Sequence, residues 1–417
     1  MSRYLPPRSS SVKALNAVGR WLRAVGVSGA RLDEGWLLGW ASRNTGLADF
    51  GDEAFREPLR RLLRAFEEES YLTPVGRVIA QRDTLRTLEN RLYLIEARRR
   101  HPEMAEAPIR EPVFVVGLPR TGSTALHELL AQDPENRVPM TWEVMWPWPF
   151  PEAASYRSDP RIAKADRYLS ATDRLIPGFK KMHRMGAELP QECCMLMNHD
   201  FMSMQFHTSY RIPSFQDWMD RQDMTPIYAS HRRQLQHLQH HCPVTRGWVL
   251  KSPQHLWSLD ALVAVYPDAR IVQTHRDPVK VAASLASLVT LLRGMGSDRV
   301  DPGEVGADWT ERLAEGLSRA MAVRERPELG EARVVDVHFR EFLADPLETV
   351  RRIYSSFGMQ LGAEAERCMR RFLARHPQNE HGRHEYTLEG AGLDLETERG
   401  RFEAYQRRFD IPSEIRA

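Results

Sequence analysis

The stretch "EPVFVVGLPRTGSTALHELLAQDP", Glu111 to Pro134, decides the fold. It begins with an apolar run typical of a buried strand, Val113 to Val116, and passes through Gly117 and Gly122 into a helical pattern. A strand, a glycine turn and a helix start direct backbone N–H groups and the positive end of a helix dipole at an anion. The stretch therefore predicts a phosphate-binding loop.

The loop lacks the lysine that ends the common nucleotide-binding motif, Gly-Lys-Ser/Thr. Ser123 and Thr124 follow Gly122 directly, and the cation of the loop is Arg120. Thr121 and the two residues after Gly122 supply hydroxyl donors, and a guanidinium matches phosphate or sulfate oxygens. We therefore expect an anion to be bound by Arg120, Thr121, Gly122, Ser123 and Thr124.

Three further apolar runs are typical of buried strands: "GWVLKS" (247–252), "ARIVQTHR" (269–276) and "ARVVDVHF" (332–339). Helical patterns lie between them, as in a parallel sheet with helical crossovers. We therefore predict an α/β domain over 111–417, with a parallel central sheet flanked by helices. Residues 1–110 read as a helical N-terminal region, and about 140–245 as a helical insert rich in Trp, Met, His and Pro.

The composition excludes several classes of protein. The 417 residues include 58 basic and 56 acidic side chains, without the basic excess of a nucleic-acid-binding surface. The four cysteines form neither a metal-type C-x-x-C motif nor a disulfide framework, which favours a reducing cytoplasm. The sequence shows no signal-peptide core and no run of about 18 apolar residues, so we expect no membrane span.

The N-terminal segment has an apolar repeat at helical spacing, made by Val12, Leu15, Val18, Leu22 and Val25 beside Trp21. Most amphipathic helices turn such a face to their own core, and this is the interpretation we favour. The alternative is a helix that lies on a membrane surface, so a peripheral membrane contact stays open. Nothing in the sequence indicates the oligomeric state.

A second group of polar residues follows the later strands. Lys251 ends one predicted strand, Arg276 ends the next, and Ser284 lies eight residues after Arg276 on a helical stretch. The carboxyl ends of neighbouring parallel strands share one crevice, where ligands bind. We therefore expect Lys251 and Arg276 to lie beside the 117–124 loop, giving two anion sites with a cation between them.

"GLPRTGST" (117–124) and "RDPVKVAAS" (276–284) together resemble the sulfotransferase superfamily that uses 3′-phosphoadenosine 5′-phosphosulfate (PAPS). The chain is most similar to the bacterial branch, and less to the protein-tyrosine branch. The resemblance covers about 111–400 and includes the segment "NEHGRHEYTLEGAGLD" (379–394). It implies that the first motif binds the 5′-phosphosulfate, and that Arg276 and Ser284 bind the 3′-phosphate.

The segment "VHFREFLADP" (337–346) resembles the strand and turn that follow the fourth strand in this family. It departs from the family pattern at Phe339, Arg340 and Glu341, which we expect to touch no site residue.

The resemblance implies an enzyme that transfers a sulfuryl group from PAPS to a hydroxyl. A nucleoside-triphosphate enzyme must hold Mg²⁺ between phosphates. A sulfuryl group carries one charge, and cationic side chains can stabilise its phosphate leaving group directly, so we expect no metal cofactor. We expect Lys251 to lie at the bridging oxygen and Arg120 to take part in the charge stabilisation.

The acceptor hydroxyl needs a base. Glu143 lies in "MTWEVMWPWPFP" (140–151), and the protein-tyrosine branch places a glutamate base in about this region. Small-molecule relatives use a histidine, which leaves His183, His199 and His207 as further candidates. The other reading of Glu143 is an ion-pair partner for Arg120 or Lys251.

The last patterns concern a metal and the acceptor. His237 and His241 are four residues apart, but no further ligand has convincing spacing, so a solvated helix face is favoured. The segment "ECCMLMNHDFMSMQFHTSY" (192–210) suits a core or an adaptable apolar pocket, which would take an apolar alcohol, phenol or lipid. Two rival functions remain, an ATP-dependent phosphotransferase and a non-catalytic nucleotide-binding scaffold.

Overall fold

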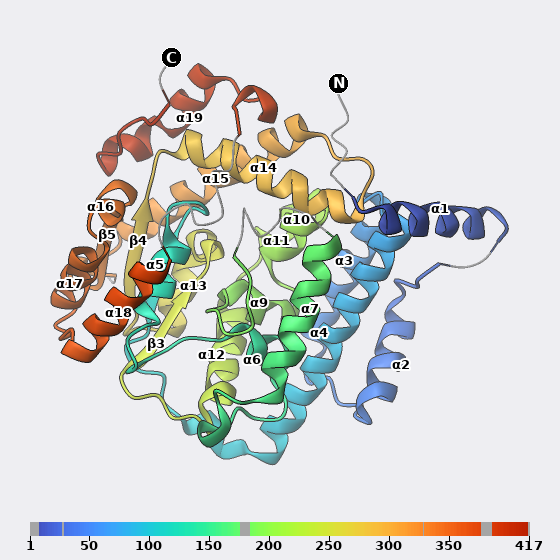
Figure 1. Cartoon of the computed structure of the whole chain (residues 1–417), viewed down its shortest axis with the longest axis horizontal. Helices are drawn as coiled ribbons and strands as arrows, with labels where there is room; N and C mark the ends of the chain where they lie inside the picture. The colour runs from blue at the N-terminus through green and yellow to red at the C-terminus, as the bar shows by residue number, and fades with distance from the viewer. Residues whose placement is uncertain (1–7, 27–28, 176–183, 328, 377–385, 416–417) are drawn as a thin grey trace.

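The computed structural model describes residues 8–26, 29–175, 184–327, 329–376 and 386–415. Its centre is a parallel five-stranded sheet with the strand order β2-β3-β1-β4-β5 (Figure 1). The strands are β1 (Val113–Gly117), β2 (Asn136–Arg137), β3 (Gly247–Lys251), β4 (Arg270–His275) and β5 (Val334–His338). The four predicted strands and the α/β class are confirmed. The two-residue β2 was not predicted, because it is too short to carry an alternating pattern.

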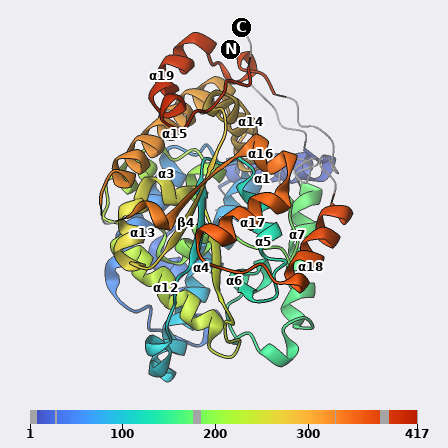
Figure 2. The same cartoon turned by 90° about the vertical axis from the view of Figure 1, so that its left-hand side faces the viewer.

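All five residues of β1 are buried, because β3 and β4 flank this strand and helices cover both faces of the sheet. Side chains alternate between the two faces of a strand. Phe114 and Val116 pack with α12 (Thr225–Gln239), α13 (Leu259–Val265), α14 (Pro278–Gly296) and α15 (Pro302–Arg324). Val113 and Val115 pack on the opposite face with α5 (Ser123–Leu130), α17 (Pro346–Ser356) and α18 (Ala363–Arg375). Figure 2 shows these three helices on the same side of the sheet.

The N-terminal region is helical, as predicted, with α1 (Ser10–Ala24), α2 (Glu34–Thr45), α3 (Arg56–Glu68) and α4 (Pro74–Arg100). Helices α2 to α4 belong to the same apolar core as the sheet, since Leu59 and Leu88 share one cluster with Phe114. The first turn of α4 meets the last turn of α14 through two glycines. A Cβ at Gly76 would lie 2.1 Å from the carbonyl oxygen of Gly296, so only glycine permits this contact.

Helix α1 differs from the other N-terminal helices. Val12 is buried, but Leu15, Val18, Trp21 and Val25 are all more than half exposed. The interpretation that its apolar repeat packs on the rest of the protein is therefore wrong for most of that repeat.

The insert between β2 and β3 is also helical, as predicted. Before α12 it contains α6 (Thr141–Met145), α7 (Pro160–Leu175), α9 (Cys193–Met197), α10 (Met204–Ser209) and α11 (Pro213–Met219). The chain ends with α16 (Phe339–Ala344), α17, α18 and α19 (Leu395–Arg408). Within the described residues, α14 alone is long and apolar enough to cross a membrane, and 78% of its apolar window is buried inside the protein.

Candidate active site

The loop between β1 and α5 has the backbone of an anion-binding turn. Gly117 and Gly122 have φ angles of 143° and 84°, which favour glycine. A Cβ at Gly117 would lie 2.3 Å from the hydroxyl oxygen of Thr274 on β4, so the close approach of the two strands also requires glycine there. Arg120 has a φ of 69°, which is uncommon for a residue with a side chain and is often found at functional sites.

The three hydroxyl side chains of the loop, Thr121, Ser123 and Thr124, have different surroundings. The Thr121 hydroxyl donates to the Leu118 carbonyl at 2.6 Å and lies 2.7 Å from the Thr274 hydroxyl, and the residue is buried. Thr121 is not on the wall of the cavity described below, whereas Ser123 and Thr124 are. The Thr121 side chain thus fastens the loop to β4, and the expectation that its hydroxyl faces the ligand finds no support here.

The strand ends bring the predicted cations to this loop. The Lys251 ammonium, at the end of β3, donates to the Thr124 hydroxyl at 2.9 Å. Arg276, directly after β4, donates to the Arg120 carbonyl at 3.0 Å, and Arg120 donates to the Ser284 hydroxyl at 3.2 Å. Burial is the main cause that lowers the pKa of the Arg120 guanidinium, and Arg276 adds to it. The structure therefore brings Arg120, Lys251, Arg276 and Ser284 together around one loop.

Phe339 belongs to this site, contrary to the expectation. The Arg276 guanidinium carbon lies 4.0 Å from the centre of the Phe339 ring, a cation–π contact. A Cβ at Gly122 would lie 2.9 Å from the same ring, and Phe339 lines the cavity. The position where the sequence departs from the family pattern thus contacts two site residues.

A carboxylate near the C-terminus also reaches this site, which the sequence did not indicate. The two Glu414 carboxylate oxygens accept hydrogen bonds from Arg276 at 2.9 and 3.1 Å, and one lies 3.1 Å from the Lys280 ammonium. The Glu414 backbone N–H donates to Asp277 at 2.6 Å. The two carboxylate contacts occupy the Nε and Nη2 edge of the Arg276 guanidinium, and a guanidinium edge of this kind can also bind a phosphate.

One cavity of about 1030 Å³ adjoins the loop. Part of its wall carries the polar groups described above, and we call this part the basic end: Arg120, Ser123, Thr124, Lys251 and Arg276. Another part is mostly apolar, and we call it the apolar end: Leu285, Leu288, Leu292 and Met295 of α14, Val75 and Ile79 of α4, and Met185, Leu189, Met195 and Met204 of the insert. The cavity thus joins a site for an anion to a site for an apolar group.

Helix α14 connects the two ends. Its first turns carry Ser284, which accepts from Arg120, and its last turn carries Met295. At 1.5 Å per residue the two positions are about 16 Å apart. Charged side chains of α4 also line the cavity, and three of them have partners: Arg86 pairs with Asp83 at 2.9 Å, and Glu89 with Asn44 at 2.6 Å.

Glu192 is a carboxylate of the cavity wall that contacts the basic end. It forms an ion pair with the buried Lys251, whose ammonium also contacts Thr124. Cys194 and Met195, two and three residues further along the chain, line the cavity as well. Sequence reasoning missed Glu192 because nothing in its spacing separates it from the other acidic residues. Its role arises from the contact between the insert and the end of β3.

Glu143 lies elsewhere. It is fully buried, and both of its oxygens accept from Arg137, at 2.8 and 2.6 Å. It also accepts from the Tyr156 hydroxyl at 3.1 Å and from the Met140 N–H at 2.8 Å. Glu143 is not on the cavity wall. The alternative reading, an ion pair, fits the structure, but the partner is Arg137 and not Arg120 or Lys251.

The structure describes two of the three histidine candidates, and both lie away from the cavity. His199 and His207 are buried and absent from the cavity wall. His199 bonds Gln234 at 2.8 Å, and His207 bonds Asp308 at 2.7 Å. Burial, with help from Arg293, lowers the pKa of His207 to about 4. His183 lies outside the described residues.

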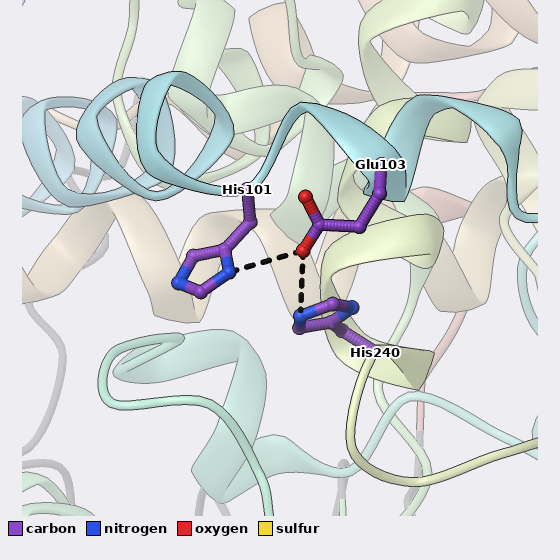
Figure 3. Close-up of side chains that lie close together, drawn as sticks. All are labelled: His101, Glu103 and His240. Carbon is purple, nitrogen blue, oxygen red and sulfur yellow. Dashed lines mark hydrogen bonds and ion pairs between the residues drawn. The ribbon is translucent and has the colours of Figure 1, made fainter.

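The two histidines considered as metal ligands face different partners. His237 is buried and lies 2.8 Å from the Pro147 carbonyl, while His241 lies 2.6 Å from Glu152. A different group gathers at the end of α12: His240 with His101 and Glu103, drawn in Figure 3. None of these three lies on the cavity wall.

The comparisons with known proteins agree with this site. Residues 112–363 match the sequence profile described as the sulfotransferase family. The solved sulfotransferase STF1 of Mycobacterium tuberculosis is 34% identical, with a TM-score of 0.78, over 89% of this chain and 98% of that one. Sulfotransferase STF9 of Mycobacterium avium is 31% identical, with a TM-score of 0.84, over 93% and 99%.

A curated relative, the omega-hydroxy-beta-dihydromenaquinone-9 sulfotransferase Stf3 of Mycobacterium bovis, is 24% identical over 305 residues. The match covers 69% of this chain and 73% of that protein. The family profile takes in the loop, both strand-end cations and most of the cavity wall, and the two solved structures extend over the N-terminal helices. The chain belongs to the sulfotransferase family, with the α/β fold of its members.

Proposed function

We propose that this sulfotransferase transfers a sulfuryl group from PAPS to a hydroxyl of an apolar acceptor: an alcohol, a phenol or a lipid. The observation that carries the proposal is the single cavity, which joins three cations and the N–H groups of the loop to a wall of apolar side chains. A donor with two phosphate-type groups matches the first part, and an apolar acceptor matches the second.

The residues of the basic end fit such a donor. The turn at Gly122 and the start of α5 offer backbone N–H groups, and Ser123 and Thr124 add hydroxyls, which suits the 5′-phosphosulfate. Arg276 and Ser284, joined through Arg120, suit the 3′-phosphate. These assignments rest on the family resemblance and on the grouping of the side chains.

The pair of Lys251 and Glu192 suits the chemistry. The acceptor oxygen forms a bond to sulfur while the bond between sulfur and the oxygen of the 5′-phosphate breaks. The Lys251 ammonium donates a hydrogen bond to that departing oxygen, where negative charge grows. The Glu192 carboxylate takes the proton of the acceptor hydroxyl. Glu192 replaces Glu143 in this role because Glu192 lines the cavity and Glu143 does not.

The name of the curated relative supports an apolar acceptor. Stf3 is named for a hydroxylated menaquinone derivative. In the present chain α14 contributes leucines at positions 285, 288 and 292, and the insert adds methionines, which are flexible enough to fit apolar groups of different shapes. Both of these observations favour a lipid-like alcohol.

The function is tested by incubating the protein with labelled PAPS and a panel of lipid alcohols, steroids and phenols. Mass spectrometry should find a sulfated product that is missing with Lys251→Ala. Turnover of ATP with Mg²⁺ in place of PAPS would favour the phosphotransferase. Binding of PAPS without product on any acceptor would favour the scaffold.

The base is tested with Glu192→Gln and a matched control, Glu128→Gln. Glu128 lines the same cavity and pairs with Arg184 at 3.0 Å, and burial raises the pKa of its carboxyl. Glu192→Gln should lose roughly 10²–10⁴-fold in kcat on an alcohol, the usual contribution of a general base. An acidic phenol, which is already ionised, should restore most of the rate. If Glu128→Gln shows this loss and rescue instead, Glu128 is the base.

A further inference from the structure

Helix α1 presents an apolar face that nothing in the described chain covers. Eight large apolar side chains are exposed among the described residues, and four of them are Leu15, Val18, Trp21 and Val25. At about 100° per residue, Leu15, Val18 and Trp21 fall on one side of the helix within about 120°. Trp21 is 63% exposed, more than any other large apolar side chain among them.

The opposite side of α1 is fixed to the protein. The Asn16 side chain accepts from the Val75 N–H of α4 at 3.0 Å, and a Cβ at Gly19 would lie 2.4 Å from Pro74. Arg8, just before the helix, donates to the carbonyls of Gly294 at 3.1 Å and Ser297 at 2.6 Å. The apolar face is therefore held outward, and Figure 1 shows α1 at the edge of the molecule, beside the last turn of α14.

The basic charge of the N-terminal segment favours a partner that carries negative charge. Residues 1–32 contain six basic residues and no acidic one. On α1 the exposed Lys13 and Arg20 fall on the side of the helix away from Leu15 and Leu22, and Arg20 lies 3.4 Å from Asp298. A helix with an apolar face and a basic remainder is the type that lies in the interface of an anionic bilayer.

The same helix belongs to the apolar end of the cavity. Val12 and Arg8 line the cavity together with Val75, Ile79 and Met295. Arg82 of α4 also lines it and is exposed, so the cavity wall reaches the surface in this region. A lipid that leaves a bilayer beneath α1 would thus meet the apolar end directly.

We propose that α1 docks the protein on an anionic lipid bilayer and places the apolar end of the cavity against it, so that the acceptor enters from the membrane. This inference rests on the proposed apolar acceptor. The docking itself needs no PAPS and no turnover, so the two proposals can fail separately.

The test is co-sedimentation of the full chain with two kinds of vesicle, phosphatidylcholine alone and phosphatidylcholine mixed with phosphatidylglycerol. Wild type should bind the anionic vesicles at least about tenfold more tightly. The double variant Val18→Glu/Trp21→Glu should lose at least about tenfold of that affinity, because it places charge in the inserted face. Trp40→Glu is the matched control, an exposed tryptophan on α2, and should bind as wild type does.

Turnover of a water-soluble phenol should be unchanged in the double variant, since neither residue lines the cavity. Turnover of a lipid alcohol in vesicles should fall with the binding. Absence of vesicle binding by the wild type, or equal binding by the double variant, overturns the docking. So does a wild-type dimer that the double variant breaks without any vesicle binding, since α1 then covers a second copy. Vesicle binding through α1 without a sulfated product overturns only the proposed function.

A separate observation concerns the group of His101, Glu103 and His240. The His101 Nδ1 lies 3.1 Å from Glu103 Oε1, and the His240 Nε2 lies 3.7 Å from the same oxygen. Figure 3 shows both rings turned towards this carboxylate. The three ligand atoms lie within 4.8 Å of one another; His101 follows the end of α4, Glu103 lies in the short 3-10 helix Pro102–Glu106, and His240 follows the end of α12.

We propose that this group binds a Zn²⁺ ion, which prefers imidazole nitrogen and carboxylate oxygen and here would link α4 to α12. The histidine spacing in 231–242 could not predict this group, because its other two members, His101 and Glu103, come from a distant part of the sequence. Isothermal titration with ZnCl₂ should show one binding event that His240→Ala weakens at least about tenfold. His241→Ala, its neighbour, should bind zinc normally. Equal zinc binding by wild type and His240→Ala, or none by wild type, overturns the site.

Discussion

The basic end and the apolar end of the cavity are built in opposite ways. The basic end comes from a continuous loop and the ends of two strands adjacent to β1, so its parts lie near one another in any sheet of this order. The apolar end collects α4, α14 and the insert from separate parts of the chain. The basic end is therefore suited to a ligand that stays the same, such as the proposed donor. The side chains of the apolar end can differ between proteins that act on different acceptors.

Lys251→Ala should have a large effect on turnover, because Lys251 is the cation of the basic end that we propose contacts the departing oxygen. We expect kcat to fall by roughly 10²–10³-fold, while the affinity for PAPS falls much less, since the contact strengthens as charge develops on the leaving oxygen. Rapid kinetics with an acidic phenol should show no rescue. A variant that loses PAPS binding and keeps its kcat would make Lys251 a ligand of the donor only.

Arg276→Ala should affect the basic end alone. We expect PAPS binding to weaken by about 2–4 kcal/mol, the value of a charge-assisted phosphate contact, with an unchanged KM for the acceptor. Calorimetry with adenosine 5′-phosphosulfate, which lacks the 3′-phosphate, should show almost no loss. Equal losses for the two ligands would contradict the assignment of Arg276 to the 3′-phosphate.

Leu292→Asn should affect the apolar end alone. A polar group on this wall should raise the KM for a lipid alcohol by about tenfold and leave PAPS affinity as it is. Leu291→Asn is the control, since Leu291 is buried on the same helix but does not line the cavity. Thermal melts of both variants separate loss of stability from loss of acceptor binding. A matching rise in KM for Leu291→Asn would show that the cavity wall is not the cause.

Glu414→Gln should give the smallest effect, and in the opposite direction. Its carboxylate pairs with an edge of Arg276 that can also bind a phosphate, so its neutralisation should tighten PAPS binding by about fivefold, the scale of one partly exposed ion pair. The measurement is again calorimetry with PAPS. Weaker binding would mean that Glu414 holds Arg276 in place for the donor and does not compete with it.

The loop, the two strand-end cations and the serine on α14 could all be predicted from short stretches of sequence. They depend on chain neighbours and on one rule of parallel sheets, and both are visible without tertiary contacts. Thr121 shows the limit of this approach, because a hydroxyl in the motif can turn to the ligand or to the adjacent strand. The tertiary structure shows the second case, because the Thr121 hydroxyl lies 2.7 Å from the Thr274 hydroxyl of β4.

By itself, the sequence determined the α/β class, the glycine turn between β1 and α5 and the resemblance to sulfotransferases, because these follow from local patterns. The tertiary structure alone decided which carboxylate meets Lys251. Glu143 forms an ion pair with Arg137 of β2. Glu192, which directly precedes α9, forms an ion pair with Lys251 at the end of β3. It also decided that α1 leaves its apolar face exposed. A periodic pattern specifies that a face is apolar, but what covers that face depends on distant parts of the chain.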